Sequence, residues 1–163
     1  MEYKSKKITI MALIIGCFLF SCNEKGKYGF YDYSKLEHYY RIPILKPYSI
    51  LSDDKGKTWM FQSEEYADYK YSAGYVYSIG VIDSNRVVVY SKRNSSNPPF
   101  YIWQVIDVHE KTGITLKSEE EYMDYLKNSH IGSVKLYSDF NALYKEFSEE
   151  KRLPSEWPYQ PSK

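Results

Sequence analysis

Asp107 and His109 are the two side chains whose types and spacing suit metal binding or acid–base catalysis in this 163-residue chain. They lie at the end of an apolar run, and alternation along a strand would place both on one face. Such a pair could supply two metal ligands, or an acid and a base. Since the sequence offers no third partner at ligand spacing, we interpret the pair as a polar strand terminus.

The other clustered carboxylates are explained by local structure. Asp53-Asp54 belongs to a predicted turn, and Glu119–Glu121 begins a predicted helix, where acidic residues are favourable. The chain lacks the Gly-x-Ser-x-Gly and His-Glu-x-x-His patterns of hydrolases. We therefore predict no catalytic residue, no metal site, no cofactor and no enzyme activity.

The N-terminus has the layout of a secretory signal peptide. Three lysines precede an apolar run, Ile8–Phe20, and the chain becomes polar directly after Cys22. That run has 13 residues, whereas a helix that spans a bilayer needs roughly 20. The sequence therefore predicts an exported protein and no spanning helix in this segment.

The tetrad Leu19-Phe20-Ser21-Cys22 resembles the lipobox of bacterial lipoproteins. The resemblance implies cleavage before Cys22 and attachment of acyl chains such as palmitate there. Two or three such chains would anchor the protein stably in a membrane. Cys17 fits the pattern loosely, but cleavage before it would leave an apolar mature N-terminus. In some bacterial lipoproteins an aspartate directly after the cysteine is linked with retention in the inner membrane. This chain has Asn23 at that position, which favours the outer membrane in an envelope that has two membranes.

The composition of the mature chain excludes several classes of function. The 21-residue signal carries three of the 22 basic and one of the 21 acidic residues, which leaves 142 residues with a formal charge of −1. This balance argues against a nucleic-acid partner. With Cys17 removed and Cys22 acylated, the domain has no thiol for a disulfide, a metal site or a nucleophile.

Tyrosine is the most unusual feature of the composition, with 19 residues beside seven phenylalanines and three tryptophans. Many of these rings suit half-buried strands of a β-rich core. Tyr66, Tyr69 and Tyr71 lie instead in a polar segment whose spacing suits neither a strand nor a helix stripe. We predict that these three form a binding surface for a protein or a glycan.

The segment Ser52–Trp59 matches the pattern Ser-x-Asp-x-Gly-x-Thr-Trp at every fixed position. It resembles the Asp-box of sialidase propellers, and the resemblance implies a hairpin turn away from any catalytic centre. Asp54 can bond its own following backbone, Gly56 supplies positive φ, and Trp59 packs beneath the turn. One box in 142 residues cannot make a propeller, since each blade needs roughly 40–50 residues.

Strand patterns precede helix patterns along the chain, which favours an α+β fold. We expect an antiparallel sheet with two amphipathic helices, near 118–129 and 138–151, packed on one face. A capping box at Ser118–Glu121 begins the first helix. The expected organisation is a signal peptide at 1–21, a tether at 22–35, one globular domain at 36–154 and a loose tail at 155–163.

The stretch Tyr101–Tyr125 resembles a unit of small bacterial lipoproteins to which no activity is assigned. From the sequence we expect a lipid-anchored envelope protein with a non-catalytic binding or structural role. One alternative is a lipid-anchored immunity or inhibitor protein that neutralises a toxin or a hydrolase. A second alternative is a small cell-wall or glycan hydrolase.

Overall fold

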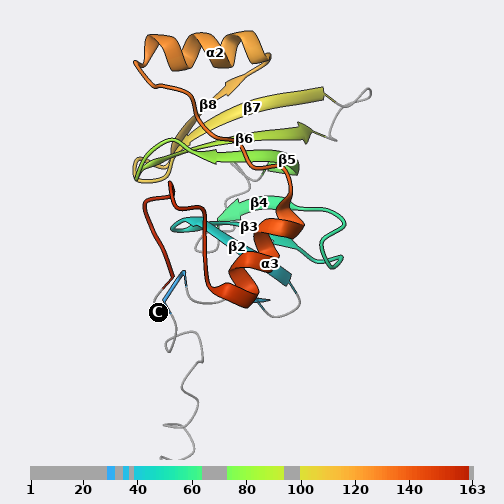
Figure 1. The fold of residues 1–163 in the computed structure, drawn as a ribbon. Coiled ribbons are helices and arrows are strands. Elements are labelled where there is room, and N and C mark those ends of the chain that lie inside the picture. Colours follow the sequence, from blue (N-terminus) through green and yellow to red (C-terminus); the bar gives the residue numbers. More distant parts are fainter. Residues whose placement is uncertain (1–28, 32–34, 37–38, 64–72, 94–99, 162–163) are drawn as a thin grey trace, which may run out of the picture.

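A computed structural model describes residues 29–31, 35–36, 39–63, 73–93 and 100–161 (Figure 1). Within them, eight strands form one sheet in which sequence neighbours pair, always antiparallel. The strands are β1 (Lys35–Leu36), β2 (Tyr39–Leu45), β3 (Tyr48–Ser52), β4 (Met60–Ser63), β5 (Ala73–Val81), β6 (Arg86–Arg93), β7 (Phe100–Asp107) and β8 (Thr112–Leu116). Helices α2 (Glu119–Asn128) and α3 (Phe140–Glu150) follow. The domain is α+β and consists mostly of sheet.

The Asp-box forms the turn between β3 and β4, as the resemblance implies. Asp54 accepts hydrogen bonds from the Thr58 amide at 2.9 Å and the Thr58 hydroxyl at 2.6 Å. These hydrogen bonds, with the Thr58 hydroxyl first, lower the pKa of the Asp54 carboxyl to about 2. Gly56 has φ of +89° and its amide donates to Ser52 Oγ at 2.8 Å. Trp59 is buried below the turn.

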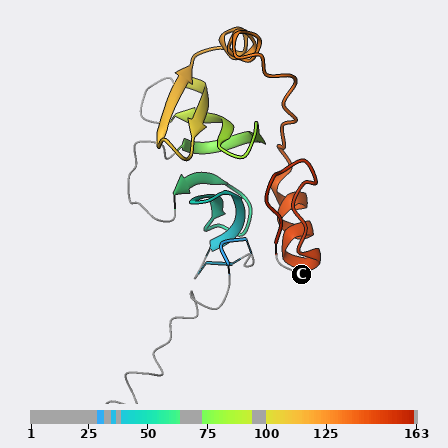
Figure 2. The same cartoon turned by 90° about the vertical axis from the view of Figure 1, so that its left-hand side faces the viewer.

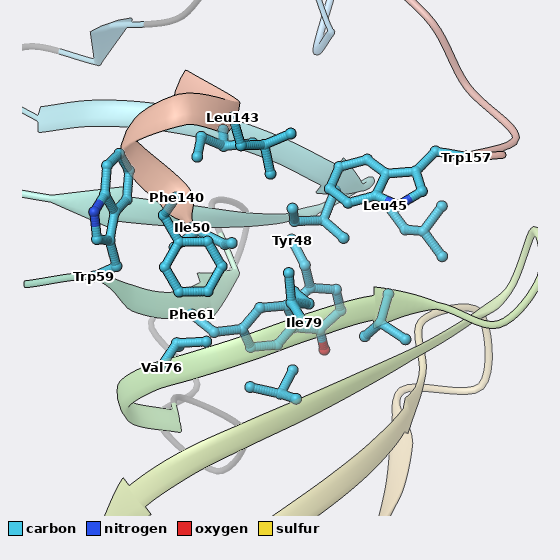
Figure 3. Close-up of a cluster of buried hydrophobic side chains, with 14 of the residues drawn as sticks. Leu45, Tyr48, Ile50, Trp59, Phe61, Val76, Ile79, Phe140, Leu143 and Trp157 are labelled. Carbon is cyan, nitrogen blue, oxygen red and sulfur yellow. The ribbon is translucent and has the colours of Figure 1, made fainter. Parts of the chain in front are cut away.

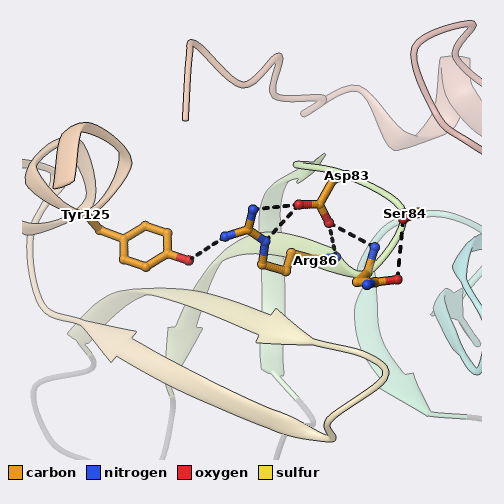
Figure 4. Close-up of polar contacts among 5 residues, drawn as sticks. Asp83, Ser84, Arg86 and Tyr125 are labelled. Atoms are coloured by element: carbon orange, nitrogen blue, oxygen red, sulfur yellow. Dashed lines mark hydrogen bonds and ion pairs between the residues drawn. The ribbon is translucent and has the colours of Figure 1, made fainter. Parts of the chain in front are cut away.

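The hairpin of β5 and β6 is closed by Asp83, as Figure 4 shows. Asp83 Oδ1 accepts from the backbone amides of Asn85 and Arg86 at 2.9 and 2.8 Å. The guanidinium of Arg86 donates to Asp83 Oδ2 and, at 3.4 Å, to the hydroxyl of Tyr125 on α2. The turn therefore also holds helix α2.

The main hydrophobic cluster lies between α3 and the sheet (Figure 3). Phe140, Leu143 and Phe147 form the buried stripe of α3, at the i, i+3, i+7 spacing of one helix face. Within the cluster, Tyr48 stacks on Phe61 of the adjacent strand at 5.1 Å between ring centroids. The helix begins at Asp139, which caps it by accepting from the Ala142 amide.

Helix α2 belongs to a second cluster on the other side of the sheet. Its buried residues Tyr122 and Leu126 pack with Val88 of β6, whereas Val87 and Val89 belong to the main cluster. Successive strand residues point to opposite faces, so the two helices cover opposite faces of the sheet. The expectation that both pack on one face is wrong, because the segment between them passes from one face to the other beside the part of β5 that β4 leaves unpaired.

The segment between α2 and α3 (Figure 2) meets β5 in an isolated antiparallel bridge between Tyr137 and Ile79. The amide of Tyr137 donates to the Ile79 carbonyl at 2.8 Å, and the Ile79 amide donates back at 2.9 Å. A Cβ atom at Gly80 would meet the Lys135 carbonyl at 2.8 Å, so glycine permits this close approach. The chain thereby covers the part of the β5 edge that the shorter β4 leaves open.

Both ends of the described chain pack on the domain. Phe30 lies over the buried Arg41 guanidinium, 4.5 Å from the ring centroid, and Tyr31 stacks on Tyr159. Trp157 belongs to the main cluster. The expectation of a tether is therefore wrong for Phe30 and Tyr31 of 22–35, and that of a loose tail is wrong for Trp157 and Tyr159 of 155–163. The aromatic side chains of both segments have partners on the domain.

Candidate aromatic binding face

Aromatic side chains cover one face of strands β5, β6 and β7. We define the aromatic face as Tyr75, Tyr77, Tyr90, Tyr101 and Trp103. Tyr90 pairs directly with Trp103 across β6 and β7, and Lys92, two residues along β6, pairs with both Tyr75 and Tyr101. Because residues two apart on a strand share a face, these side chains lie on the same side of the sheet as α2.

The rings of this face form a continuous series that begins beneath α2. Tyr122 of α2 stacks on Trp103 at 4.4 Å between centroids with an interplanar angle of 3°. Trp103 stacks on Tyr90 at 4.6 Å. Tyr77, Tyr90 and Tyr101 then form a triangle with centroid distances of 5.4, 5.8 and 6.2 Å. Each ring supports the next, so the outermost rings are held in place.

Exposure rises steadily along the series. Tyr122 and Trp103 are 4% and 8% exposed, whereas Tyr77 and Tyr101 are 43% and 44% exposed. Helix α2 covers the buried end, where Tyr122 and Leu126 pack with Val88 and Trp103. The outer half of the face is therefore a rigid aromatic surface that the described residues leave open to solvent.

A β-bulge directs Tyr77 towards this surface. Val76 pairs with Ser91 and Ser78 pairs with Tyr90, so Tyr77 is the extra residue between them. Bulges commonly reorient a side chain at a functional edge of a sheet. A side-chain hydrogen bond with Tyr101 is the main cause that raises the pKa of Tyr77.

A cavity of about 310 Å³ lies at β5, where Tyr75, Val76 and Tyr77 contribute to its lining. Its other walls are the Asp-box turn and the first residues of α3, which supply Thr58 and Asn141. Trp59 also lines the cavity, and its Nε1 atom is buried without a hydrogen-bond partner among the described residues. Trp59, Val76 and Phe140 of its lining belong to the main cluster, so the cavity lies on the α3 side of the sheet.

The site residues expected from the sequence lie outside the described part of the chain. Tyr66, Tyr69 and Tyr71 belong to the segment 64–72, which joins β4 to β5, and Cys22 lies in the segment 1–28. Their predicted roles in binding and lipid attachment therefore stay predictions. Tyr71 precedes Tyr75 by four residues, so the chain connects the predicted surface directly to the aromatic face.

Asp107 and His109 do not contact each other through their side chains. Asp107 Oδ1 accepts from the backbone amides of His109 and Glu110 at 3.0 and 2.8 Å, which closes the hairpin of β7 and β8. The His109 side chain is 78% exposed and lies 3.2 Å from the Glu110 carboxylate. Among the described residues, no three His, Cys, Asp or Glu side chains gather as a metal site would require.

The chain matches no family model, no curated protein and no solved structure. In the described ranges, none of the helices has the length and hydropathy of a membrane span. The description of the aromatic face is therefore based only on the geometry of its own residues.

Sequence reasoning missed all five residues of the aromatic face as members of a site. The run Phe100–Val108 reads as a central strand that is apolar on both faces, and nothing local distinguishes its covered half from its open half. The alternating aromatics at 75 and 77 and at 101 and 103 were the available signal. They become one surface only through the pairing of three strands.

Proposed function

We propose that this protein is a lipid-anchored envelope protein that binds a glycan on its aromatic face and catalyses no reaction. The lipobox-like tetrad that ends at Cys22 supports the anchor. The ring series from buried Tyr122 to exposed Tyr77 and Tyr101 is the observation that carries the binding role.

The chemistry of the face favours a sugar as its ligand. The apolar C–H face of a pyranose packs on an aromatic ring, while phenol hydroxyls remain available for its hydroxyl groups. Tyr77 and Tyr101 supply such hydroxyls beside the stacked rings of the face. Binding sites typically combine apolar walls with a few polar groups in this way.

Co-sedimentation of the mature chain with purified cell-wall sacculi tests the binding role. Tyr77→Ala and Tyr101→Ala should each weaken binding by ~1–3 kcal/mol, the range that truncating an aromatic anchor costs. Tyr159→Ala is the matched control, because Tyr159 is also 44% exposed but lies against Tyr31, away from this face. Retention of full binding by both face variants would refute a glycan role for these rings.

A protein partner is the competing outcome of the same experiment. If sacculi fail to retain the wild-type chain while a toxin or hydrolase forms a complex that Tyr101→Ala weakens, the immunity or inhibitor function replaces the glycan role. If His109→Ala alone removes an activity and the tyrosine variants are neutral, the hydrolase alternative holds.

Lipid labelling tests the anchor separately. Cys22→Ser should abolish incorporation of radiolabelled palmitate, while Cys17→Ser should leave it intact. The opposite pattern would move the attachment site to Cys17.

A further inference from the structure

A second cavity, of about 510 Å³, lies apart from the aromatic face where the two ends of the described chain meet the strand turns. The N-terminal segment contributes Tyr31 and the C-terminal segment contributes Tyr159. The turn between β2 and β3 contributes Lys46, and the turn between β7 and β8 contributes His109 and Lys111.

The wall of this cavity is ordered by specific contacts. Tyr31 and Tyr159 stack at 5.3 Å between centroids with an interplanar angle of 17°. The backbone amide of Lys46 donates to the Tyr31 hydroxyl at 3.1 Å. The N-terminal segment thus joins a strand turn to the C-terminal end and fixes the shape of the cavity.

The side chains around the cavity suit an anion. Two lysines and a histidine line it, together with the hydrogen-bonding groups of Ser84 and Asn85. Its described lining includes no carboxylate. Glu110 lies beside it and contacts His109 at 3.2 Å. Lysine ammonium groups are common phosphate binders, and neutral polar donors add hydrogen bonds to the phosphate oxygens.

The cavity lies close to the lipid anchor along the chain. Tyr31 follows Cys22 by nine residues, a covalent reach of at most ~30 Å. The intervening sequence carries Lys25 and Lys27 against Glu24, which adds one net positive charge. We propose that this cavity binds the phosphate of an anionic lipid headgroup in the membrane that holds the Cys22 anchor. This proposal rests on the anchor of the proposed function.

Anchoring makes a weak headgroup site effective. A site held within a short reach of the bilayer meets headgroups at a high effective concentration, so even modest affinity gives substantial occupancy. Occupancy would orient the domain with the Tyr31 side towards the membrane. The aromatic face, formed by other strands, would then remain available to a ligand in the surrounding envelope.

Hydrogen–deuterium exchange of the mature lipoprotein in vesicles tests the proposal. Intact mass spectrometry first establishes that the acyl chains are present, so failure of the anchor is recognised separately. Exchange at the amides of residues 45, 46 and 108–111 should slow in vesicles of phosphatidylcholine with phosphatidylglycerol, relative to phosphatidylcholine alone. The double variant Lys46→Gln/Lys111→Gln should lose this protection.

Lys127→Gln/Lys145→Gln is the matched control, because both lysines are exposed on helices and neither lines the cavity. It should retain the protection. Equal exchange in both vesicle types for a lipidated protein would overturn the proposal. So would protection by inorganic phosphate in pure phosphatidylcholine vesicles with none from phosphatidylglycerol, since the ligand would then be a soluble anion.

Discussion

The two faces of the sheet use aromatic residues differently. On the α3 side, Trp59, Phe61 and Trp157 are at most 5% exposed and lie within one closed cluster. On the α2 side, the ring series begins in a cluster but continues outwards until Tyr77 and Tyr101 are exposed by more than two-fifths. The same residue class therefore forms a core on one face and a surface on the other.

The reason for the difference is coverage by the helices and by the chain ends. Helix α3 and Trp157 close the first face, whereas α2 covers only the part of the second face around Val88 and Trp103 and leaves Tyr77 and Tyr101 exposed. Burial of an aromatic ring stabilises the fold, while an exposed ring with fixed neighbours offers binding energy at little entropic cost. Substitutions on the two faces should therefore affect different measurements.

The largest effect on stability should come from Phe61→Ala. Phe61 is fully buried and stacks on Tyr48, so truncation leaves a cavity in the main cluster. We expect a loss of ~3–5 kcal/mol in the free energy of unfolding. Denaturant titration measures it, and Phe61→Leu should lose much less. A loss of a few tenths of a kcal/mol would show that this face is not the core.

Gly56→Ala should have an intermediate effect, because it forces a side chain into the +89° φ of the Asp-box turn. The expected cost is about 1–2 kcal/mol. The new Cβ would also lie 2.2 Å from Asn141 Oδ1, so the cost should fall partly in an Asn141→Ala background.

Gly132→Ala is the matched control for this turn. Its Cβ would meet no atom within 4 Å and it has no positive φ. If Gly56→Ala and Gly132→Ala change the melting temperature equally, the turn does not constrain the fold as described.

Acid should destabilise the Asp-box turn between β3 and β4. The pKa of the Asp54 carboxyl is lowered from 3.8 to about 2 in the folded chain, so the folded state holds its proton less tightly than the unfolded state. The stabilisation is present above about pH 4 and is lost as the pH falls towards 2. The melting temperature of Asp54→Asn should therefore fall less steeply over this range than that of the wild type. Parallel curves would contradict the assignment.

The smallest stability effect should come from Tyr101→Ala on the aromatic face. Its ring is 44% exposed and its removal creates no enclosed cavity. We expect a change within about 0.5 kcal/mol, measured by the same denaturant titration as Phe61→Ala. A loss comparable with that of Phe61→Ala would make Tyr101 a core residue.

The parts of the fold that depend on neighbouring residues were predictable from the sequence. The Asp-box turn and the capping box are closed by bonds that span two to four residues. Glu121 also reaches back to the chain before the helix, where it accepts from the Lys117 amide at 2.7 Å. Such bonds depend on the order of a few residues, which a sequence shows directly.

The parts that depend on distant contacts were not predictable. The positions of α2 and α3 on opposite faces follow from the bridge between Tyr137 and Ile79, which are far apart in the chain. The second helix, expected near 138–151, runs from Phe140 to Glu150 with Asp139 as its N-cap. Likewise, the open half of the aromatic face depends on where α2 stops covering β7, and no local pattern encodes that limit.

Tyrosine footprinting of the mature chain with purified sacculi tests the binding role of the aromatic face most directly. Nitration of Tyr77 and Tyr101 should fall when the chain is bound, because a ligand stacked on these rings shields them. Tyr159, which has the same exposure as Tyr101 in the free chain, should react at an unchanged rate. Protection of Tyr159 with no change at Tyr77 and Tyr101 would contradict the account and place the binding surface elsewhere.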